Sequence, residues 1–272
     1  MSSQSGPDFD AIKARQQKTW ASGDYAMVGG TIVAVAENLC EAVDLRPTSK
    51  VLDVACGSGN TALAAARRFC DVTGVDFVRE LLGRARERAA AERLTVDLRE
   101  GDAEALAFAD GSFDVVLSTF GAMFAPNQER TAVELARVCR QGGTIGMANW
   151  TPEGFIGQLF KMTASHVPPP AGLRSPVLWG SEDRVRELFG DRVSSLGLTR
   201  RTFTFRFRSA EHWLEYFRSY YGPTMKAFEA LDEAGREAYA SDLLGLIGRF
   251  NRSGDATMVV PGEYLEVVAV RA

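Results

Sequence analysis

The sequence has few cysteines and histidines, and it has no excess of positive charge. Of its 272 residues, four are Cys and two are His, and no two cysteines stand in a C-x-x-C pair. This scarcity argues against a disulfide scaffold and against a zinc site built from neighbouring residues, so we predict no metal ion. The formal net charge of -4 argues against the basic surface of a nucleic-acid-binding protein, so we predict no nucleic-acid partner.

Long apolar runs and targeting signals are also missing. No stretch approaches the roughly 20 apolar residues of a membrane-spanning helix, so we predict no membrane span. The first ten residues, MSSQSGPDFD, lack the basic stretch and apolar core of a secretory signal. We therefore expect a cytoplasmic protein with reduced cysteines. Its 46% of hydrophobic residues are enough for an ordinary globular core.

What the sequence does contain is an alternation of strands and helices over residues 51–149. Strands are predicted over residues 51–55, 72–77, 95–100, 113–119, 144–149, 201–208 and 264–271. Helices are predicted over residues 8–20, 27–43, 61–69, 78–93, 130–139, 153–165, 182–189 and within 210–250. This order indicates an α/β protein with a doubly wound, Rossmann-like, mostly parallel seven-stranded sheet that carries helical lid and cap insertions.

The same pattern divides the chain into three parts. Residues 1–45 are predicted to form an N-terminal helical lid, and residues 46–150 a cofactor-binding core. After Trp150 the alternation stops, and the proline-rich stretch HVPPPAGLRSPVLWG is incompatible with regular structure. Residues 151–272 are predicted to complete the sheet and to insert a substrate cap at about 151–180 and 209–258. We expect a monomer or a homodimer.

A glycine-rich turn joins the first predicted strand to its helix. The stretch VLDVACGSGNTA contains Gly57, Gly59 and Ala62 at the spacing G-x-G-x-x-G/A of dinucleotide-binding proteins. Small residues here indicate only that the backbone passes close to a ligand or to a neighbouring element. The turn alone does not exclude a nicotinamide-dependent oxidoreductase, so the segments that follow it must show which cofactor the protein binds.

Four segments in order resemble the class I S-adenosylmethionine-dependent methyltransferases: VLDVACGSGN, GVDF, GDAEALAFADGSFDVVLS and RQGGTIGMANW. More narrowly, the sequence looks like the branch that includes the ubiquinone and menaquinone C-methyltransferases and many bacterial small-molecule methyltransferases. The resemblance covers residues 48–150 and departs from the family at Ala55, which stands where the first glycine of the turn is expected. It implies an enzyme that uses S-adenosylmethionine and releases S-adenosylhomocysteine.

The resemblance also implies a cofactor site at the ends of the predicted strands. In the first strand, the carboxylate of Asp53 would favour a sulfonium and an amino group, or would fix the turn, and it would repel a pyrophosphate. Asp76, at the end of the second strand, can accept from both ribose hydroxyls. Asp102 would accept from the adenine amino group, which distinguishes this family from nicotinamide enzymes. The other implied contacts are the turn at Ala55, Gly57 and Gly59, the amide of Ala103, Phe77 or Leu106 over the purine, and Ser118, Thr119 and Phe120 at the methionyl group.

Few residues are candidates for catalysis, because methyl transfer from a sulfonium is an in-line displacement that mainly needs a well-held acceptor. Trp20 and Tyr25 are expected to begin a lid over the cofactor, and Tyr25 could reach the cofactor carboxylate or the acceptor. An alcohol or an activated carbon would also need a base. His166 is the first candidate for that base and His212 a weaker one, although both could be structural.

Aromatic residues gather after Trp150 and indicate a pocket for a small, largely apolar or aromatic methyl acceptor. We expect Trp179 and Tyr220 to face this pocket. The sequence does not distinguish methylation at O, N, S or C. A thiol or phenol acceptor is favoured, because the sequence shows no obvious base. A quinone-type C-methyltransferase and a non-catalytic S-adenosylmethionine-binding module are the alternatives.

Overall fold

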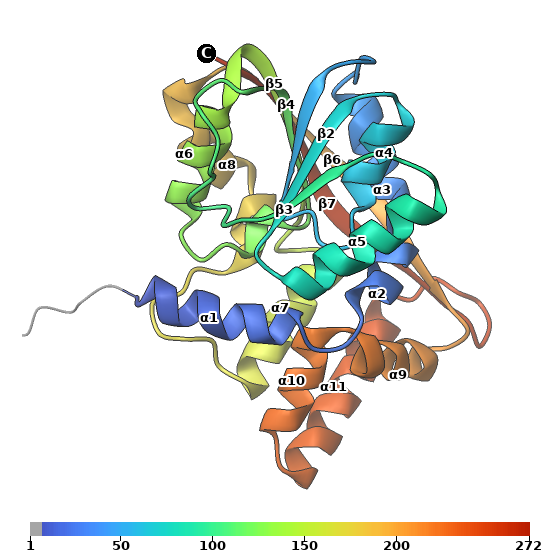
Figure 1. Ribbon diagram of the computed structural model, residues 1–272. Coiled ribbons are helices and arrows are strands. Elements are labelled where there is room, and N and C mark those ends of the chain that lie inside the picture. Colours follow the sequence, from blue (N-terminus) through green and yellow to red (C-terminus); the bar gives the residue numbers. More distant parts are fainter. Residues whose placement is uncertain (1–6) are drawn as a thin grey trace, which may run out of the picture.

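The computed structural model describes residues 7–272, which contain a seven-stranded sheet (Figure 1). Its strands are β1 (Lys50–Val54), β2 (Asp71–Asp76), β3 (Asp97–Glu100), β4 (Phe113–Thr119), β5 (Cys139–Trp150), β6 (Val193–Phe207) and β7 (Met258–Arg271). They lie in the order β3-β2-β1-β4-β5-β7-β6. Strands β1 to β5 pair in parallel, and β7 runs antiparallel to both β5 and β6. The predicted α/β fold with a mostly parallel sheet is confirmed.

Helices cover both faces of this sheet. They are α1 (Phe9–Trp20), α2 (Tyr25–Thr31), α3 (Val33–Ala42), α4 (Asn60–Arg67), α5 (Arg79–Ala91), α6 (Gln128–Val138), α7 (Phe155–His166), α8 (Glu182–Phe189), α9 (Ala210–Tyr220), α10 (Gly222–Ala230) and α11 (Glu233–Phe250). Because side chains alternate along a strand, Val51 packs in one apolar cluster with α3 and α4. Its neighbour Leu52 packs in a second cluster with α6 and the cap helices. The central strands are therefore buried on both sides.

The strand order places a natural binding site at one edge of the sheet. The chain leaves β1 toward β2 and β3 and then returns to the other side of β1 through β4. At such a reversal, the connections that follow neighbouring strands separate and leave a crevice at the carboxyl ends. The turns after β1, β2 and β4 meet there.

Several predicted elements differ in their bounds from those observed. The helix expected over residues 27–43 is two helices, because the chain leaves helical geometry at Ile32 (φ -115°, ψ 17°). Gly29 and Gly30, just before this break, have low helix propensity. Strands β6 and β7 pair from Val193 opposite Arg271 to Phe207 opposite Met258, about twice the predicted lengths. The first half of β6 is a solvent-exposed edge, so its sequence lacks a clear apolar alternation.

The remaining helices gather at one end of the molecule (Figure 1). There α1 and α2 lie beside α9 and α10, and α7 lies beside α11. Both predicted insertions, about 151–180 and 209–258, fall in this region, while the boundaries at residues 45 and 150 stay predictions. Residues 1–6 of the predicted lid, and of the stretch checked for a secretory signal, lie outside the described residues. In the described range, no helix has the length and apolarity needed to cross a membrane.

Candidate active site

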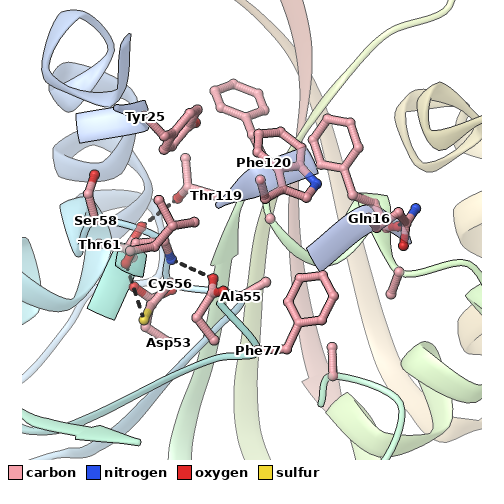
Figure 2. Close-up of a pocket in the computed structure, with 18 of the residues that line it drawn as sticks. Gln16, Tyr25, Asp53, Ala55, Cys56, Ser58, Thr61, Phe77, Thr119 and Phe120 are labelled. Atoms are coloured by element: carbon pink, nitrogen blue, oxygen red, sulfur yellow. Dashed lines mark hydrogen bonds between the residues drawn. The ribbon is translucent and has the colours of Figure 1, made fainter. Parts of the chain in front are cut away.

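A cavity lies at the carboxyl ends of β1, β2 and β4, where the strand order reverses (Figure 2). Its empty space, counted together with the solvent at its mouth, is about 940 Å³. Its walls come from α1 and α2, from the turns after the three strands, and from the loop at residues 101–103. We refer to it as the cofactor cavity.

Asp53 lies in the wall of the cofactor cavity and fixes the turn after β1. The residue is 1% exposed, and its Oδ2 accepts a hydrogen bond from the amide of Ala62 at 2.9 Å. Burial raises the pKa of Asp53 to about 8, with the charge of Asp76 adding to the effect and the bond from Ala62 opposing it. A cation bound beside Asp53 would lower this pKa again, since it would stabilise the charged form of a buried acid.

The backbone of the turn has the conformation that glycine favours. Gly57 and Gly59 have φ of 53° and 88°, and Ala55 has φ of 53°. Ala55 thus keeps the left-handed conformation of the glycine that the family pattern expects, at a cost of about 1–2 kcal/mol. Gly59 does not line the cavity and instead caps α4. A Cβ on Gly121 would lie 2.2 Å from the carbonyl oxygen of Ala55, so the turns after β1 and β4 are in close contact.

Asp76 ends β2 and presents its carboxylate to the same cavity. Its Oδ2 accepts from the amide of Gly57 at 2.8 Å, and its Oδ1 accepts from the amide of Val78 at 2.9 Å. Burial raises its pKa to about 6, although these hydrogen bonds lower it in part. A carboxylate has about four acceptor positions, so two remain for the hydroxyls of a bound ribose.

Asp102 lines the cavity, but its carboxylate already has two partners. Its Oδ2 accepts from Nζ of Lys13 at 2.8 Å, and its Oδ1 accepts from the amide of Glu104 at 2.8 Å. Lys13 belongs to α1, and the sequence did not indicate this link. Ala103 and Phe77 also line the cavity, whereas Leu106 is buried in the core and does not. Of the two predicted purine covers, only Phe77 is in position.

Ser118 does not line the cofactor cavity, so the prediction that it contacts the cofactor is wrong. Its hydroxyl donates to the carbonyl of Val54 and accepts from the amide of Ala122, at 2.8 and 2.9 Å. These bonds hold β4 to β1 and start the short helix after β4. The next residue, Thr119, lines the cavity, and its hydroxyl is 2.8 Å from that of Thr61 (Figure 2).

The N-terminal helices cover the cavity with Trp20 and Tyr25. The ring of Trp20 packs edge-to-face on Tyr25 at 5.6 Å and on Phe124 at 4.9 Å. Burial, together with the charge of Asp76, raises the pKa of Tyr25 to about 12. The phenol therefore keeps its proton at neutral pH, so that it can donate a hydrogen bond but cannot act as a base.

Two glutamines of α1 that sequence reasoning missed tie the helix to the rim. Gln16 donates to the carbonyl of Phe124 at 3.0 Å, and Gln17 donates to the carbonyl of Phe77. Gln16 also lines the cavity. A glutamine on a predicted helix is usually solvent-exposed, so nothing in the sequence could have identified these two.

The prediction of a histidine base is not supported by the geometry. His166 lies at the end of α7, and its Nε2 is 2.7 Å from Oδ2 of Asp242 on α11. Its ring packs against Tyr239, so it joins two cap helices and lines neither the cofactor cavity nor the cavity beside it. His212 also lies outside both cavities and accepts from the amide of Arg208 at 3.3 Å.

A second, apolar cavity adjoins the first, and we call it the acceptor cavity. It encloses about 430 Å³ up to the open solvent, and no charged side chain is among the described residues that line it. It shares five wall residues with the cofactor cavity: Trp20, Tyr25, Ile32, Phe120 and Phe124. Its remaining walls are Val28, Trp150, Ile156, Leu159, Phe160, Phe205, Phe217 and Tyr221.

The expectation that Trp179 and Tyr220 face this cavity is wrong. Trp179, near the end of the proline-rich stretch, is fully buried and packs against Phe189. Tyr220 packs against Tyr216, and its carbonyl accepts from the amide of Asp24. Trp179 is therefore an ordinary core residue, and Tyr220 supports the lid from outside.

The chemistry of the cofactor cavity fits a cationic nucleoside better than a dinucleotide. Asp53 and Asp76 place two carboxylates in one wall, which would repel a pyrophosphate and attract a sulfonium or an ammonium group. Lys13 is the one cationic side chain among the described lining residues, and Asp102 and Glu104 already pair with it. The fold and this site together define an S-adenosylmethionine-dependent methyltransferase of class I.

Comparisons with known proteins agree with this class. Residues 52–147 match the family model of a methyltransferase domain. The chain is 45% identical to an uncharacterised protein of Mycobacterium tuberculosis over 80% of this chain and 81% of that one. It is 35% identical to phosphatidylethanolamine N-methyltransferase of Cereibacter sphaeroides, over 52% of this chain and 69% of that enzyme. The chain belongs to the class I methyltransferases, and its cofactor is S-adenosylmethionine.

Two further comparisons bear on the branch and on the fold. Demethylmenaquinone methyltransferase of Deinococcus radiodurans is 35% identical over 45% of this chain and 53% of that enzyme, which supports the predicted quinone-type branch in part. The crystal structure of the YcgJ protein from Bacillus subtilis has a TM-score of 0.59 at 18% identity, and the match covers 88% of this chain and 98% of that one. This structural likeness confirms the methyltransferase fold.

Proposed function

We propose that the protein methylates a small, largely apolar or aromatic molecule bound in the acceptor cavity. The observation that carries this proposal is the shared wall between the two cavities. Five residues line both, and the acceptor side has no charged side chain among the described lining residues. Burying a charged acceptor there without a partner would be costly, so a neutral acceptor fits best.

Different residues around the two cavities would hold the cofactor and the methyl acceptor. S-adenosylmethionine, when bound, supplies an electrophilic methyl group on a sulfonium. Asp53 compensates positive charge, and Asp76 and Asp102 supply acceptors for ribose and adenine. Ala55, Gly57, Thr119 and Ala103 line the same space, and Phe77 covers it, while Gly59 only shapes the turn.

The aromatic walls of the acceptor cavity keep water out and hold the acceptor for an in-line displacement. Neither histidine lines the cofactor cavity or the acceptor cavity, and Tyr25 keeps its proton at neutral pH. We therefore favour an acceptor that ionises without a strong base, such as a phenol or a thiol. The cytoplasmic location and the monomeric or homodimeric state remain predictions.

A quinone-type C-methylation is the second candidate. The Deinococcus radiodurans relative is named for a demethylmenaquinone substrate, and a quinol head group is apolar enough for this cavity. The two candidates differ in the atom that receives the methyl group. A quinol would be methylated at ring carbon, whereas a simple phenol or thiol would be methylated at oxygen or sulfur.

Methyl transfer from labelled S-adenosylmethionine to a panel of thiols, phenols, amines, carboxylic acids and isoprenoid quinols tests the proposal. We expect label in a phenol or thiol product, and label at ring carbon of a quinol would select the second candidate. Transfer confined to charged amines or carboxylic acids would overturn the apolar-acceptor proposal. Binding of S-adenosylhomocysteine should be measured in parallel, because binding without transfer to any class would revive the non-catalytic alternative.

A further inference from the structure

Phe120 has a backbone conformation that a bulky residue rarely adopts. Its φ is 55°, in the left-handed region where residues with a side chain are strained. Its amide donates to the carbonyl of Ala148 at 2.8 Å, and its ring stacks on Trp150 with the centroids 3.8 Å apart and the planes 3° apart. Tyr264 packs edge-on against the same ring at 5.7 Å. The neighbours thus hold Phe120 in one place.

That place is the boundary between the cofactor and acceptor cavities. Phe120 lines both cavities (Figure 2). Of the other four shared wall residues, Trp20 ends α1, Tyr25 begins α2, Ile32 lies between α2 and α3, and Phe124 ends a short 3-10 helix. Phe120, by contrast, directly follows β4. The close contact of Gly121 with the carbonyl of Ala55 fixes its distance from the cofactor turn. Phe120 is therefore the shared wall residue that the sheet itself positions.

We propose that Phe120 determines acceptor specificity by packing against a flat aromatic ring next to the methyl group to be transferred. This inference rests on the proposed function and narrows its acceptor class to aromatic molecules, phenols in particular. Trp150 lies behind Phe120 and also lines the acceptor cavity, so a ligand ring would extend an existing stack. Aromatic pairs gain affinity beyond simple burial, by about 2- to 12-fold for each pair.

The test compares two ligands that differ in flatness. 2-Naphthol is aromatic, and decahydro-2-naphthol has the same carbon skeleton and hydroxyl but no flat ring. We expect the wild-type protein, saturated with S-adenosylhomocysteine, to bind 2-naphthol roughly tenfold more tightly by calorimetry, as stacking on Phe120 and Trp150 requires. Phe120→Leu should reduce this preference to about twofold, and its affinity for 2-naphthol should fall by a larger factor than its affinity for S-adenosylhomocysteine.

The chain offers a matched control in Phe69, which also has a left-handed φ (61°) but is 78% exposed and lines neither cavity. Phe69→Leu should leave the ligand preference intact. Phe120→Met is the second variant, in case Phe120→Leu fails to fold. An unchanged preference in a folded Phe120 variant would overturn the proposal, as would an equal loss of S-adenosylhomocysteine binding. The binding test needs no turnover, so a wild type that prefers 2-naphthol but methylates nothing would refute only the proposed function.

Discussion

At the scale of single residues, Asp53 and Asp76 explain why the cofactor cavity attracts positive charge. Both carboxylates are almost fully buried and line the same cavity. Each also accepts a backbone hydrogen bond that shapes the glycine-rich turn. The two acids therefore build the turn as well as supply its charge, so substitutions should affect stability and binding together.

Asp76→Ala is expected to weaken S-adenosylmethionine binding by about 1.5–3 kcal/mol, or roughly 10- to 150-fold. Hydrogen bonds to a charged group have this magnitude, and the variant loses both acceptors proposed for the ribose. The variant should also unfold at a lower temperature, because the amides of Gly57 and Val78 lose their partner. Calorimetric titration and thermal unfolding measure the two effects.

Asp71→Ala is the matched control, since Asp71 begins the same strand but is exposed and lies outside the cavity. Its affinity for S-adenosylmethionine should equal that of wild type. If Asp76→Ala bound the cofactor as tightly as this control, Asp76 would have no part in the site.

Asp53 predicts a pH dependence of cofactor binding. Its raised pKa of about 8 means that the free protein holds a proton there at pH 7. A bound sulfonium favours the ionised form, so binding should release a proton, and the affinity should rise between pH 6 and pH 8. Calorimetry in two buffers of different ionisation enthalpy measures the released proton. Asp53→Asn should abolish the release, and an unchanged proton count in that variant would assign it to another group.

The same pKa sets the sign of a stability effect in the cofactor-free protein. Because the folded-state pKa lies above the ordinary value of 3.8, Asp53 stabilises the fold most fully below that value. This contribution is lost as the pH rises through about 8. The thermal unfolding midpoint should therefore fall as the pH rises from about 4 to about 8, and it should fall less when S-adenosylmethionine is bound.

The sequence could predict the place of a residue at a strand end, but not the partner of a residue held by a distant element. Asp76 could be predicted to reach the cavity because the end of a strand in a parallel sheet fixes where its residue lies. Ser118, Thr119 and Phe120 were predicted together at the methionyl group, and of these only Ser118 lies outside the cavity. Because β4 is buried on both faces, its sequence does not reveal that the side chain of Ser118 points away from the ligand. The pairing of His166 with Asp242 joins α7 to α11, and no local pattern encodes such a contact.

At the scale of elements, α1 acts as a strap across the cofactor cavity. Lys13, Gln16 and Gln17 attach it to three different segments: the loop at Asp102, the residue Phe124 and the end of β2 at Phe77. The contact with Asp102 would link α1 directly to the cofactor, because the carboxylate predicted to bind adenine also accepts the hydrogen bond from Lys13 of α1. Cofactor exchange should depend on how firmly α1 is attached.

Lys13→Ala is expected to loosen α1 and to speed the dissociation of S-adenosylhomocysteine by roughly 3- to 10-fold, since lids of this kind commonly limit ligand release. The variant leaves Glu104, which is 6% exposed, without its cation, so a stability loss of about 1–3 kcal/mol should accompany the change. Stopped-flow displacement measures the dissociation rate. Lys18→Ala, an exposed change in the same helix, should leave the rate unaltered, and equal rates in both variants would show that Lys13 does not hold the strap.

Elements with strong local signals matched their predicted bounds, and those stabilised by distant partners did not. Strand β4 and helix α8 occupy the predicted residues, because an apolar run and a strongly amphipathic stretch define them. Strands β6 and β7 extend well beyond prediction, because they pair with each other over 14 positions, past the residues that carry an apolar alternation. Such pairing leaves little trace in either strand alone.

At the scale of the whole molecule, the N-terminal helices and the cap segment around Tyr221 meet at the wall of the acceptor cavity. Gly23 pairs with Tyr221 through a β-bridge, and the amide of Asp24 donates to the carbonyl of Tyr220 at 3.1 Å. These contacts join the N-terminal lid to the cap helices α9 and α10. Because Tyr25 and Tyr221 both line the acceptor cavity, the shape of that cavity depends on this junction.

Gly222 is the tightest point of the junction, and Gly222→Ala tests its importance. A Cβ on Gly222 would lie 2.0 Å from the carbonyl oxygen of Thr19 and 2.9 Å from that of Ser22. Both atoms belong to backbone, so the lid must shift away from α10, at a cost of about 1–3 kcal/mol. We expect a lower thermal unfolding midpoint together with weaker binding of both S-adenosylhomocysteine and 2-naphthol, since Trp20 and Tyr25 move with the lid.

Gly248→Ala provides the opposite control within the same cap. Gly248 lies in α11, and no atom lies within 4 Å of an added Cβ, so the substitution should stabilise the helix by about 0.5–1 kcal/mol and leave ligand binding unchanged. A lower unfolding midpoint in Gly222→Ala with normal binding of both ligands would mean that the junction stabilises the fold without shaping the cavities. Loss of binding together with stability, set against the gain in Gly248→Ala, would show that the contact between the N-terminal lid and α10 shapes the active-site wall.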